Sequence, residues 1–411
     1  MSVIITTDKD GHDVRLRHAP KIDLDLFTDQ RLLHLFVKNH LIEYRKDTKK
    51  PINSFLFYSC FKLMCENLIM SPIGISVPLF KDYYSKMPKR YNCLKITAYQ
   101  LRSVINYLVS KDLIVFYKGV KFNNQSYYSR VIPSQDFKFD LRNLGLDKMR
   151  ITKNRDMERI VLKANKDKGK KKVDYKDNRQ TRSKRDFILK YEEHINKYEF
   201  KINHKRIGRI IFKRVFNNES FFSGGRFYSS YQNIPSSSRS QDMRVNNLKM
   251  REWDYAGLHI NMLYALEDLP IYNGDVYTIK GFEKFRNLFK IALQIAINAK
   301  DKRAAYSGMN KHLRSNGISS DVMTGKKLLE LFANKHIKIS HYFFSGVGVK
   351  LQYKDSQIVE KILNMAIKKN IPVLPVHDSF LAPEIYSKEI IRFMKKSALK
   401  VMNTEFNIDK K

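Results

Sequence analysis

Two stretches of the chain are the most informative about its structure: Arg251-Glu252-Trp253-Asp254-Tyr255-Ala256-Gly257-Leu258-His259 and Pro375-Val376-His377-Asp378-Ser379-Phe380. Each places a single Asp beside a short apolar run of the strand type. Asp254 is expected to end a strand, because the apolar positions from Leu258 to Leu266 have helical spacing. Asp378 is expected at the bend of a hairpin, where a carboxylate is exposed but rigidly held.

A pair of carboxylates from two strands is the minimal ligand set for two divalent cations. We therefore expect Asp254 and Asp378 to bind two Mg²⁺ ions, an arrangement suited to nucleotidyl transfer. A His-Asp pair alone is weak evidence, since His12-Asp13 occurs in the same chain. The apolar strands that flank His377-Asp378, and its position downstream of the first stretch, distinguish it from that pair.

The chain is strongly basic. Its 411 residues include 77 Lys and Arg against 41 Asp and Glu, which gives a formal net charge of +36. A field of this size suits a polyanion, either nucleic acid or an anionic membrane surface. The basic residues are interleaved with Tyr and Phe, and aromatic residues make up 12% of the chain, which favours phosphates and stacked bases. A genome whose codons favour Lys and Asn is the alternative explanation.

Cysteine usage and hydropathy indicate a cytoplasmic protein. The three cysteines have an odd count and no CxxC spacing, which argues against a zinc site and a disulfide framework. Charged residues interrupt the N-terminus before a signal-peptide core develops. Polar residues and Pro72 interrupt the apolar stretch 55–80, so no membrane partner is expected. The oligomeric state is left open.

The first third of the chain indicates an N-terminal arm at 1–25 and a separate domain at 26–140. Thr97 is expected to cap a helix, 113–117 to form a strand, and 127–132 to form the returning strand after a turn at Asn123-Asn124. This order resembles winged-helix domains of replication initiators and transcription regulators. The alternative is an α+β packing module with a charged face.

The winged-helix resemblance implies DNA contacts from two surfaces. Arg102 would lie on the recognition helix, while Lys121 and Arg130 would lie on the wing. Between residues 150 and 190 the composition then changes to dense Lys and Arg, which predicts a basic linker or thumb at 141–200. A poorly ordered linker, a basic helix and a thumb arm at 175–198 are the alternatives for this segment.

Four segments after residue 220 resemble family A DNA polymerases. The first runs from Gly224 to Pro235, and is similar to that family's Gly-Arg-Leu-Ser-Ser element followed by Gln-Asn-Ile-Pro, with a shorter spacer. The two glycines would let the backbone approach a duplex closely. The resemblance implies that Arg226 reaches the minor groove or a primer phosphate, and that Gln232 also contacts DNA.

The second segment is Asp254-Tyr255-Ala256-Gly257-Leu258-His259, which resembles motif A of the same family, Asp-Tyr-Ser-Gln-Ile-Glu. The resemblance implies that Asp254 binds both metal ions and that Tyr255 supplies a backbone carbonyl. His259 replaces the Glu that screens out the ribose 2′-hydroxyl, and this departure leaves the choice of sugar open. The imidazole could block the hydroxyl or accept a hydrogen bond from it.

The third segment, Arg286-Asn287-Leu288-Phe289-Lys290, resembles motif B on the fingers helix. Side chains four residues apart share one helical face, so Arg286 and Lys290 could neutralise a nucleoside triphosphate together. Any basic helix offers such a pair, which makes this motif weak by itself. The family's Tyr-Gly is replaced here by Asn298-Ala299.

The fourth segment, His377-Asp378-Ser379-Phe380, resembles motif C of single-subunit phage-type RNA polymerases more than the His-Asp-Glu of DNA polymerases. The resemblance implies a metal ligand at Asp378 and a contact with the primer end at His377. Gln352, just upstream, is expected to touch the duplex.

The resemblance covers 201–405 and implies an α+β fold, a right-hand polymerase palm and fingers of family A type preceded by a winged-helix domain. We expect a DNA-directed DNA polymerase without proofreading, from a phage or mobile element, that extends a primer 3′-hydroxyl on a DNA template. Its partners would be a DNA primer-template and nucleoside triphosphates. The alternatives are a single-subunit RNA polymerase or primase, a non-catalytic replication initiator or regulator, and a template-independent tailing enzyme.

Overall fold

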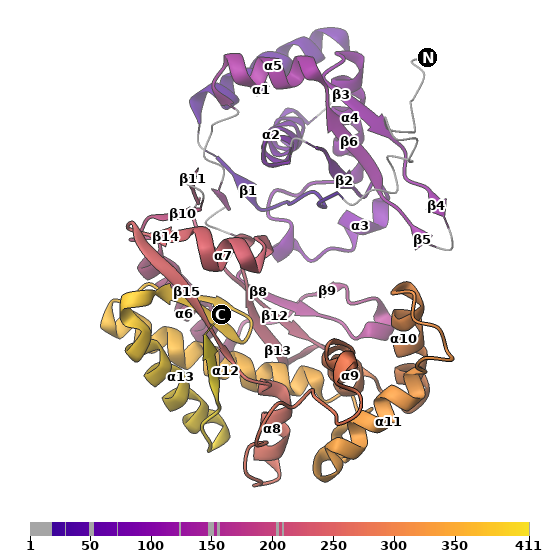
Figure 1. The fold of residues 1–411 in the computed structure, drawn as a ribbon. Helices are drawn as coiled ribbons and strands as arrows, with labels where there is room; N and C mark the ends of the chain where they lie inside the picture. The colour runs from indigo at the N-terminus through magenta and orange to yellow at the C-terminus, as the bar shows by residue number, and fades with distance from the viewer. Residues whose placement is uncertain are drawn as a thin grey trace. The chain divides into compact units, whose positions relative to one another are not determined.

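The structure is a computed structural model that describes residues 19–28, 30–48, 53–71, 73–122, 125–146, 152–153, 157–202, 205–207 and 209–410. The chain divides into two compact units (Figure 1). The N-terminal unit comprises Met1–Glu158 and Lys172–Asp174, and the C-terminal unit comprises Arg159–Lys171 and Tyr175–Lys411. Within the described ranges, no helix is long and apolar enough to cross a membrane.

The N-terminal unit combines helices with one three-stranded antiparallel sheet, in which β6 lies between β2 and β3. Its elements are β1 Leu26–Phe27, α1 Arg31–Asp47, α2 Ser54–Met70, β2 Ile75–Val77, α3 Lys81–Ser85, α4 Ala98–Ser110, β3 Ile114–Tyr117, β4 Lys121–Phe122, β5 Gln125–Ser126, β6 Ser129–Pro133, α5 Gln135–Asn143, β7 Thr152–Lys153 and β9 Lys172–Val173. The apolar faces of α2 and α4 pack on each other, and their buried side chains form the core of this unit.

Local expectations for this unit are confirmed. The Thr97 side chain accepts a hydrogen bond from the backbone N–H of Gln100 and caps α4, and β3 and β6 form the expected pair of strands. The expected turn at Asn123-Asn124 and most of the expected arm, residues 1–18, lie outside the described residues. The assignment of this unit as a winged helix stays a prediction.

The C-terminal unit contains a sheet of order β11-β10-β14-β15-β17-β16, with β18 pairing on β15 as well. These strands are β10 Phe200–Ile202, β11 Lys205–Arg206, β14 Met243–Val245, β15 Leu248–Tyr255, β16 Leu374–Val376, β17 Ser379–Pro383 and β18 Ile408–Lys410. The two stretches that opened the sequence analysis thus lie on neighbouring strands, β15 and β17.

A second sheet in this unit contains β8 Ile160–Lys163, β12 Lys213–Asn217 and β13 Ser220–Tyr228, with β12 between the other two and parallel to β8. The expectation of a poorly ordered linker is therefore wrong for residues 157–202. Ile160, Val161 and Leu162 are buried in β8, and a buried ion pair joins Arg159 to Glu192 at 3.1 Å. Apolar burial outweighs the high local charge of this segment.

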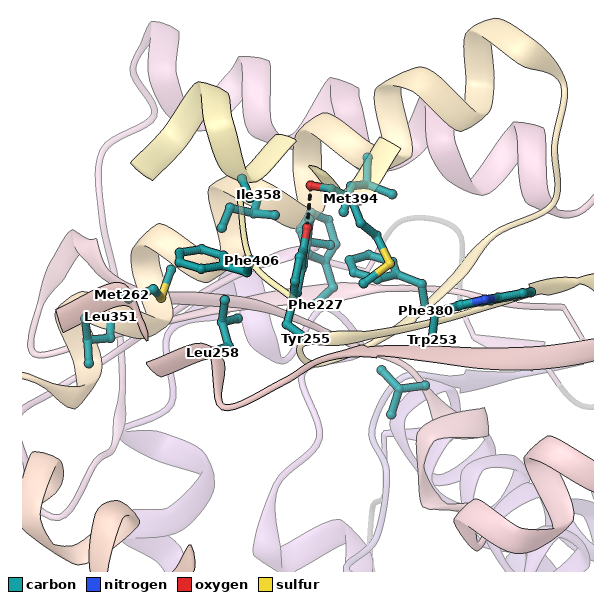
Figure 2. Packing of buried hydrophobic residues seen from close by; sticks show 14 of the residues in the cluster. Phe227, Trp253, Tyr255, Leu258, Met262, Leu351, Ile358, Phe380, Met394 and Phe406 are labelled. Carbon is teal, nitrogen blue, oxygen red and sulfur yellow. Dashed lines mark hydrogen bonds between the residues drawn. The ribbon is translucent and has the colours of Figure 1, made fainter. Parts of the chain in front are cut away.

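Helices surround these sheets: α6 Arg179–Ile195, α7 Ser236–Asp242, α8 Leu258–Leu266, α9 Arg286–Asn298, α10 Lys302–Ser315, α11 Gly325–Lys335, α12 Gly348–Lys369 and α13 Ser387–Met402. The long helix α12 packs against β13 and α13 (Figure 1). Figure 2 shows Trp253, Tyr255 and Phe380 packed with side chains of α8, α12 and α13. This apolar layer fixes the strands that carry the two acidic motifs.

Candidate active site

Antiparallel pairing between β15 and β17 brings the two motif carboxylates close together. Asp254 lies directly opposite Ser379, the residue after Asp378. Directly paired residues in antiparallel strands have Cα atoms about 5 Å apart. Asp254 and Asp378 are separated by 124 positions in the chain, yet they are neighbours across one pair of strands.

A two-residue turn presents Asp378. Val376 pairs with Ser379, so His377 and Asp378 form the bend between β16 and β17, and His377 adopts a left-handed backbone with φ +57°. The buried Ser379 hydroxyl donates to Glu252 Oε1 at 2.6 Å and thereby ties the turn to β15. The expected hairpin bend at Asp378 is confirmed, although the residue is partly buried and not exposed.

The two carboxylates open into a cleft of about 920 Å³. We call it the carboxylate cleft. It is lined by six residues that the sequence assigned to the metal or nucleotide site: Asp254, Tyr255, His259, Arg286, Lys290 and Asp378. The lining also includes Asp275, Tyr277 and Asp409, which the sequence analysis missed. The structure thus brings the three segments that resemble motifs A, B and C to one cleft.

Tyr255 contributes its main chain to this cleft. Its side chain is buried, and its hydroxyl donates to the Met394 carbonyl at 2.7 Å (Figure 2). The ring also packs edge-on against Phe380 and Phe406. With the side chain fixed in the core, only the backbone of Tyr255 is available to a bound cation.

Gly257 allows the segment 272–278 to form a wall of the cleft. Gly257 has φ +58°, and a Cβ atom there would lie 2.7 Å from Val276 Cγ2. Val276 is fixed in turn by its carbonyl, which lies 2.9 Å from His336 Nε2. A side chain at 257 would push this segment away, so the glycine of motif A sets the position of Asp275 and Tyr277.

Asp275 and Tyr277 organise the two motif B cations. Arg286 forms a bidentate ion pair with Asp275, at 2.7 Å from Nε and 2.9 Å from Nη2. Arg286 and Lys290 also lie 5.7 and 5.6 Å from the centroid of the Tyr277 ring. A triphosphate that binds both motif B cations would compete with Asp275 for Arg286.

The pKa values of Tyr277 and Asp275 are shifted in opposite directions. Burial, followed by the charges of Asp378 and Asp254, raises the pKa of the Tyr277 phenol to about 12. Tyr277 therefore stays a neutral hydroxyl close to both carboxylates. Hydrogen bonds from Arg286 and Thr278, which outweigh burial, lower the pKa of Asp275 to about 2 and keep this carboxylate ionised.

Arg226 lies in a buried polar network beside the cleft. Its Nε donates to Asp355 Oδ2 at 2.8 Å, and its Nη2 lies 3.3 Å from His259 Nε2. Burial and the charge of Arg226 lower the pKa of His259 to about 4. Because a guanidinium only donates hydrogen bonds, His259 is neutral, with Nε2 accepting and the proton on Nδ1.

Asp409 adds a carboxylate from the last strand. In the β15–β18 ladder, Asp254 lies directly opposite Asp409, so both side chains lie on the same face of the sheet. Strand β18 is anchored by the buried Phe406, by the hydrogen bond from the Ala256 N–H to the Asn407 carbonyl, and by the Lys410–Glu384 ion pair at 2.7 Å. Asp409 is therefore held beside Asp254.

The residues predicted to contact DNA differ in how accessible they are. Arg226 is held within the chain by Asp355 and His259, and its side chain is 15% exposed. Gln232 is occupied within the chain, because its Nε2 donates to the carbonyls of Phe227 and Pro375 and its Oε1 accepts from the Ser229 N–H. Gln352 lies outside the carboxylate cleft and lines a second cleft.

In the N-terminal unit, Arg102 and Lys121 are exposed, as the winged-helix interpretation requires. The expectation that Arg130 is exposed on the wing is wrong, because its side chain is only 7% exposed. Arg130 lies on β6, which pairs with strands on both sides, so its backbone is interior to the sheet. Burial lowers the pKa of Arg130.

His377 lies at the edge of the site. Its ring packs edge-on against Tyr228, with centroids 5.7 Å apart, and its buried Nδ1 has no hydrogen-bond partner among the described residues. Burial and the charge of Arg226 lower its pKa, which favours the neutral ring. A neutral imidazole with an unused nitrogen suits the predicted contact with a primer end.

The donor set fits divalent cations. The Asp378 carboxylate makes no hydrogen bond and no ion pair within the part of the chain that the structure describes. It is held on a rigid turn next to Asp254, with Asp409 and the Tyr255 backbone in the same cleft. Hard oxygen donors of this kind are the ligands that Mg²⁺ prefers. Among the described residues, no group of three or more His, Cys, Asp or Glu lies close enough together to hold a metal ion, so Asp254 and Asp378 are the two candidate side-chain ligands.

Comparisons with known proteins give a limited result. No protein-family model matches the chain, and no curated protein matches it. One solved structure similar to this chain is the POL domain of Pol1 from M. smegmatis in complex with DNA primer-template and dNTP. The sequence identity is 11%, the TM-score is 0.35, and the alignment covers 95% of this chain and 66% of that chain.

Proposed function

We propose that this protein is a nucleic-acid polymerase that extends a primer 3′-hydroxyl by transfer of a nucleotide, with two Mg²⁺ ions at Asp254 and Asp378. One observation carries the proposal: a carboxylate at the end of β15, a carboxylate on the adjacent β16–β17 turn, and two cations one helical turn apart line the same cleft. Carboxylates for metal ions and cations for a triphosphate are the two charge sets that nucleotidyl transfer needs.

Bound Mg²⁺ supplies the charge that activates the attacking hydroxyl and stabilises the leaving pyrophosphate. The protein's own contribution is to position the reactants. Asp254, Asp378 and the Tyr255 backbone hold the cations, while Arg286 and Lys290 bind the triphosphate tail. Tyr277 lies beside both charge sets and supplies a neutral hydroxyl and a ring face for the nucleotide. Asp409 lines the same cleft and adds negative charge to it.

The choice of sugar depends on His259. Its Nε2 is engaged by Arg226, so this imidazole cannot accept a hydrogen bond from a ribose 2′-hydroxyl through Nε2. Nδ1–H is left as a donor, and the ring is a steric barrier. We propose deoxynucleotides as the substrates and DNA as the template. Ribonucleotides, which an RNA polymerase or primase would use, are the competing assignment because of Ser379 and Phe380 in motif C.

For the N-terminal unit, we propose a winged-helix DNA-binding role that delivers the catalytic unit to its template. The support is the exposure of Arg102 on α4 and of Lys121 on β4, together with the large positive charge of the chain. A phage or mobile-element replication polymerase is the biological setting that we propose for the whole chain.

Primer extension tests the proposed function. The full chain is incubated with Mg²⁺, a labelled primer-template, and either dNTPs or NTPs. We expect dNTP incorporation that is lost in Asp254→Ala and Asp378→Ala and retained in the exposed control Asp321→Asn. Incorporation of NTPs only would favour the RNA polymerase assignment. A sequence-specific footprint with no incorporation of either would contradict the polymerase and favour a non-catalytic initiator.

A further inference from the structure

A second cleft in the C-terminal unit has a different lining. It measures about 500 Å³, and its polar lining consists of Lys163, Lys170, Asn217, Asn218, Asn298 and Gln352. Val215, Val349, Ala164 and Tyr228 complete it. We call it the lysine cleft. None of the described residues that line it is an Asp or a Glu, so its charge is wholly positive.

The two lysines of this cleft differ from Lys168 of the same loop and from Lys300, which pairs with that loop. Lys168 pairs with Glu219 at 2.9 Å, and Lys300 pairs with Asp167 at 3.0 Å. Lys163 and Lys170 make no ion pair within the described ranges. Burial and the neighbouring Lys170 ammonium lower the pKa of Lys163, so a bound anion would relieve two like charges at once.

The loop is built to bring these cations together. The Ala164 N–H donates to the Lys171 carbonyl at 2.8 Å, and the Lys170 N–H donates to the Asn165 carbonyl at 3.2 Å. Gly169 and Lys170 both have left-handed φ values, +73° and +51°. This tight turn folds Lys170 back toward Lys163 at the end of β8.

The lysine cleft also has an aromatic wall that leads to the proposed catalytic hairpin. Tyr228 is 41% exposed, and its ring packs on His377, the residue before Asp378. Gln352 enters the cleft from α12, one turn before Asp355, which pairs with Arg226. The Tyr228 ring would therefore contact both a ligand in the lysine cleft and the hairpin that carries Asp378.

We propose that the lysine cleft binds the backbone of a single nucleic-acid strand, with Lys163 and Lys170 on a phosphate and Tyr228 under a base. Unpaired cations, amide groups and an exposed aromatic ring are the combination that single-strand binding uses. The volume suits a short strand segment and not a duplex. This inference rests on the proposed polymerase function, because it places the strand next to the catalytic hairpin.

Equilibrium binding of a fluorescein-labelled single-stranded oligothymidine to the full chain, measured by anisotropy at several salt concentrations, tests this proposal. We expect Lys163→Gln/Lys170→Gln to weaken binding about tenfold near 0.15 M salt and to flatten the log–log salt slope by about 0.7, the contribution of one phosphate contact on a single strand. The matched control Lys168→Gln removes a lysine of the same loop that is already paired, and should change affinity less than about twofold.

Tyr228→Leu gives an independent check, because stacking is uncharged. We expect it to weaken binding roughly fivefold with an unchanged salt slope. Lys163 is half-buried, so thermal melting must first show that the double variant is folded. If the double variant does not fold, the single variant Lys170→Gln, at an exposed position, still tests the proposal. Unchanged affinity and slope in Lys170→Gln and in the double variant would overturn the proposal.

Competition separates a strand site from a mononucleotide site. Free dTTP and inorganic phosphate should fail to displace the oligothymidine, and full displacement by either would overturn the assignment to a strand. The strand-binding proposal and the polymerase proposal can also be refuted independently of each other. If the chain binds the strand through Lys163 and Lys170 but incorporates no nucleotide, the strand site is supported and the polymerase function is contradicted. If the chain incorporates nucleotides but the variants bind the strand as wild type does, the polymerase function is supported and the strand site is contradicted.

Discussion

The two clefts of the C-terminal unit differ in the sign of their charge. The carboxylate cleft combines four Asp residues with Arg286 and Lys290, whereas the described lining of the lysine cleft has cations and amides but no carboxylate. A cleft with both signs can hold metal ions and a triphosphate together, while a purely positive cleft suits phosphate backbone. If both proposals hold, the fold separates nucleotidyl transfer from strand binding. Helix α12 supplies Gln352 to the lysine cleft and Asp355 to the network beside the carboxylate cleft.

Replacement of a cation ligand should separate the clefts most clearly. Asp378→Ala should lower the nucleotide incorporation rate by about 10³-fold or more, because a metal ion loses its rigid carboxylate. Its dissociation constant for primer-template should stay within about twofold of the wild-type value, as should that of Asp321→Asn. Rapid-quench incorporation and anisotropy measure the two quantities. A parallel loss of affinity would show that the clefts are not independent.

The motif B cation should affect the nucleotide and not the strand. Arg286→Ala should raise the KM for the nucleotide about 10- to 100-fold, since one charge-assisted contact with the triphosphate is lost. Lys284→Ala, an exposed lysine just before α9 that does not line the cleft, is the control and should have a normal KM. Steady-state kinetics at fixed primer-template decides this, and an unchanged KM in Arg286→Ala would remove motif B from the site.

The buried pair between Asp355 and Arg226 predicts a pH dependence of stability. Burial and the charges of Asp378 and Asp254 outweigh Arg226 and raise the pKa of Asp355 to about 7. Because the folded-state pKa is above the unfolded value of about 4, this carboxyl contributes stability that is complete below pH 4 and is lost as the pH rises through 7.

The stability difference between wild type and Asp355→Asn should therefore shrink by roughly 2 kcal/mol from pH 5 to pH 8. Urea unfolding at both pH values measures it. A constant difference would mean that Asp355 stays ionised in the folded state. Strand affinity should be unaffected at pH 5, which keeps the test specific to the network beside the carboxylate cleft.

Asp409 should have the mildest effect. Asp409→Asn should raise the Mg²⁺ concentration for half-maximal incorporation about threefold and weaken Mn²⁺ binding, measured by calorimetry, by a similar factor. Glu405→Gln, whose carboxylate pairs with Lys395 at 3.3 Å, is the control. Normal cation binding in Asp409→Asn would leave Asp254 and Asp378 as the only carboxylates needed.

Local sequence patterns predicted those features of the fold and of the site that depend on short segments of the chain. The cap at Thr97, the end of β15 near Asp254, the hairpin bend at Asp378 and the helix that begins at Arg286 are all present. Each depends on residue types within a few positions, and the four-residue spacing of Arg286 and Lys290 is likewise local.

The parts that were missed depend on contacts between distant segments. Asp355, Tyr277 and Asp409 lie in no recognised motif. The packing of α12 places Asp355, the approach of 272–278 to Gly257 places Tyr277, and the pairing of β18 with β15 places Asp409. The apolar Ile160-Val161-Leu162 run could have indicated β8, but the surrounding charge concealed it. Arg130 was misplaced because exposure was inferred from residue type alone.

The ladder between β15 and β17 also has a kinetic consequence. It joins residues 250–254 to 379–383, so a loop of more than a hundred residues must close before the first of its hydrogen bonds can form. Contacts that close such long loops form slowly during folding. In a refolding experiment, helical circular dichroism should therefore recover before cation affinity, and newly made chains should expose the apolar edge of β15 until its partner arrives.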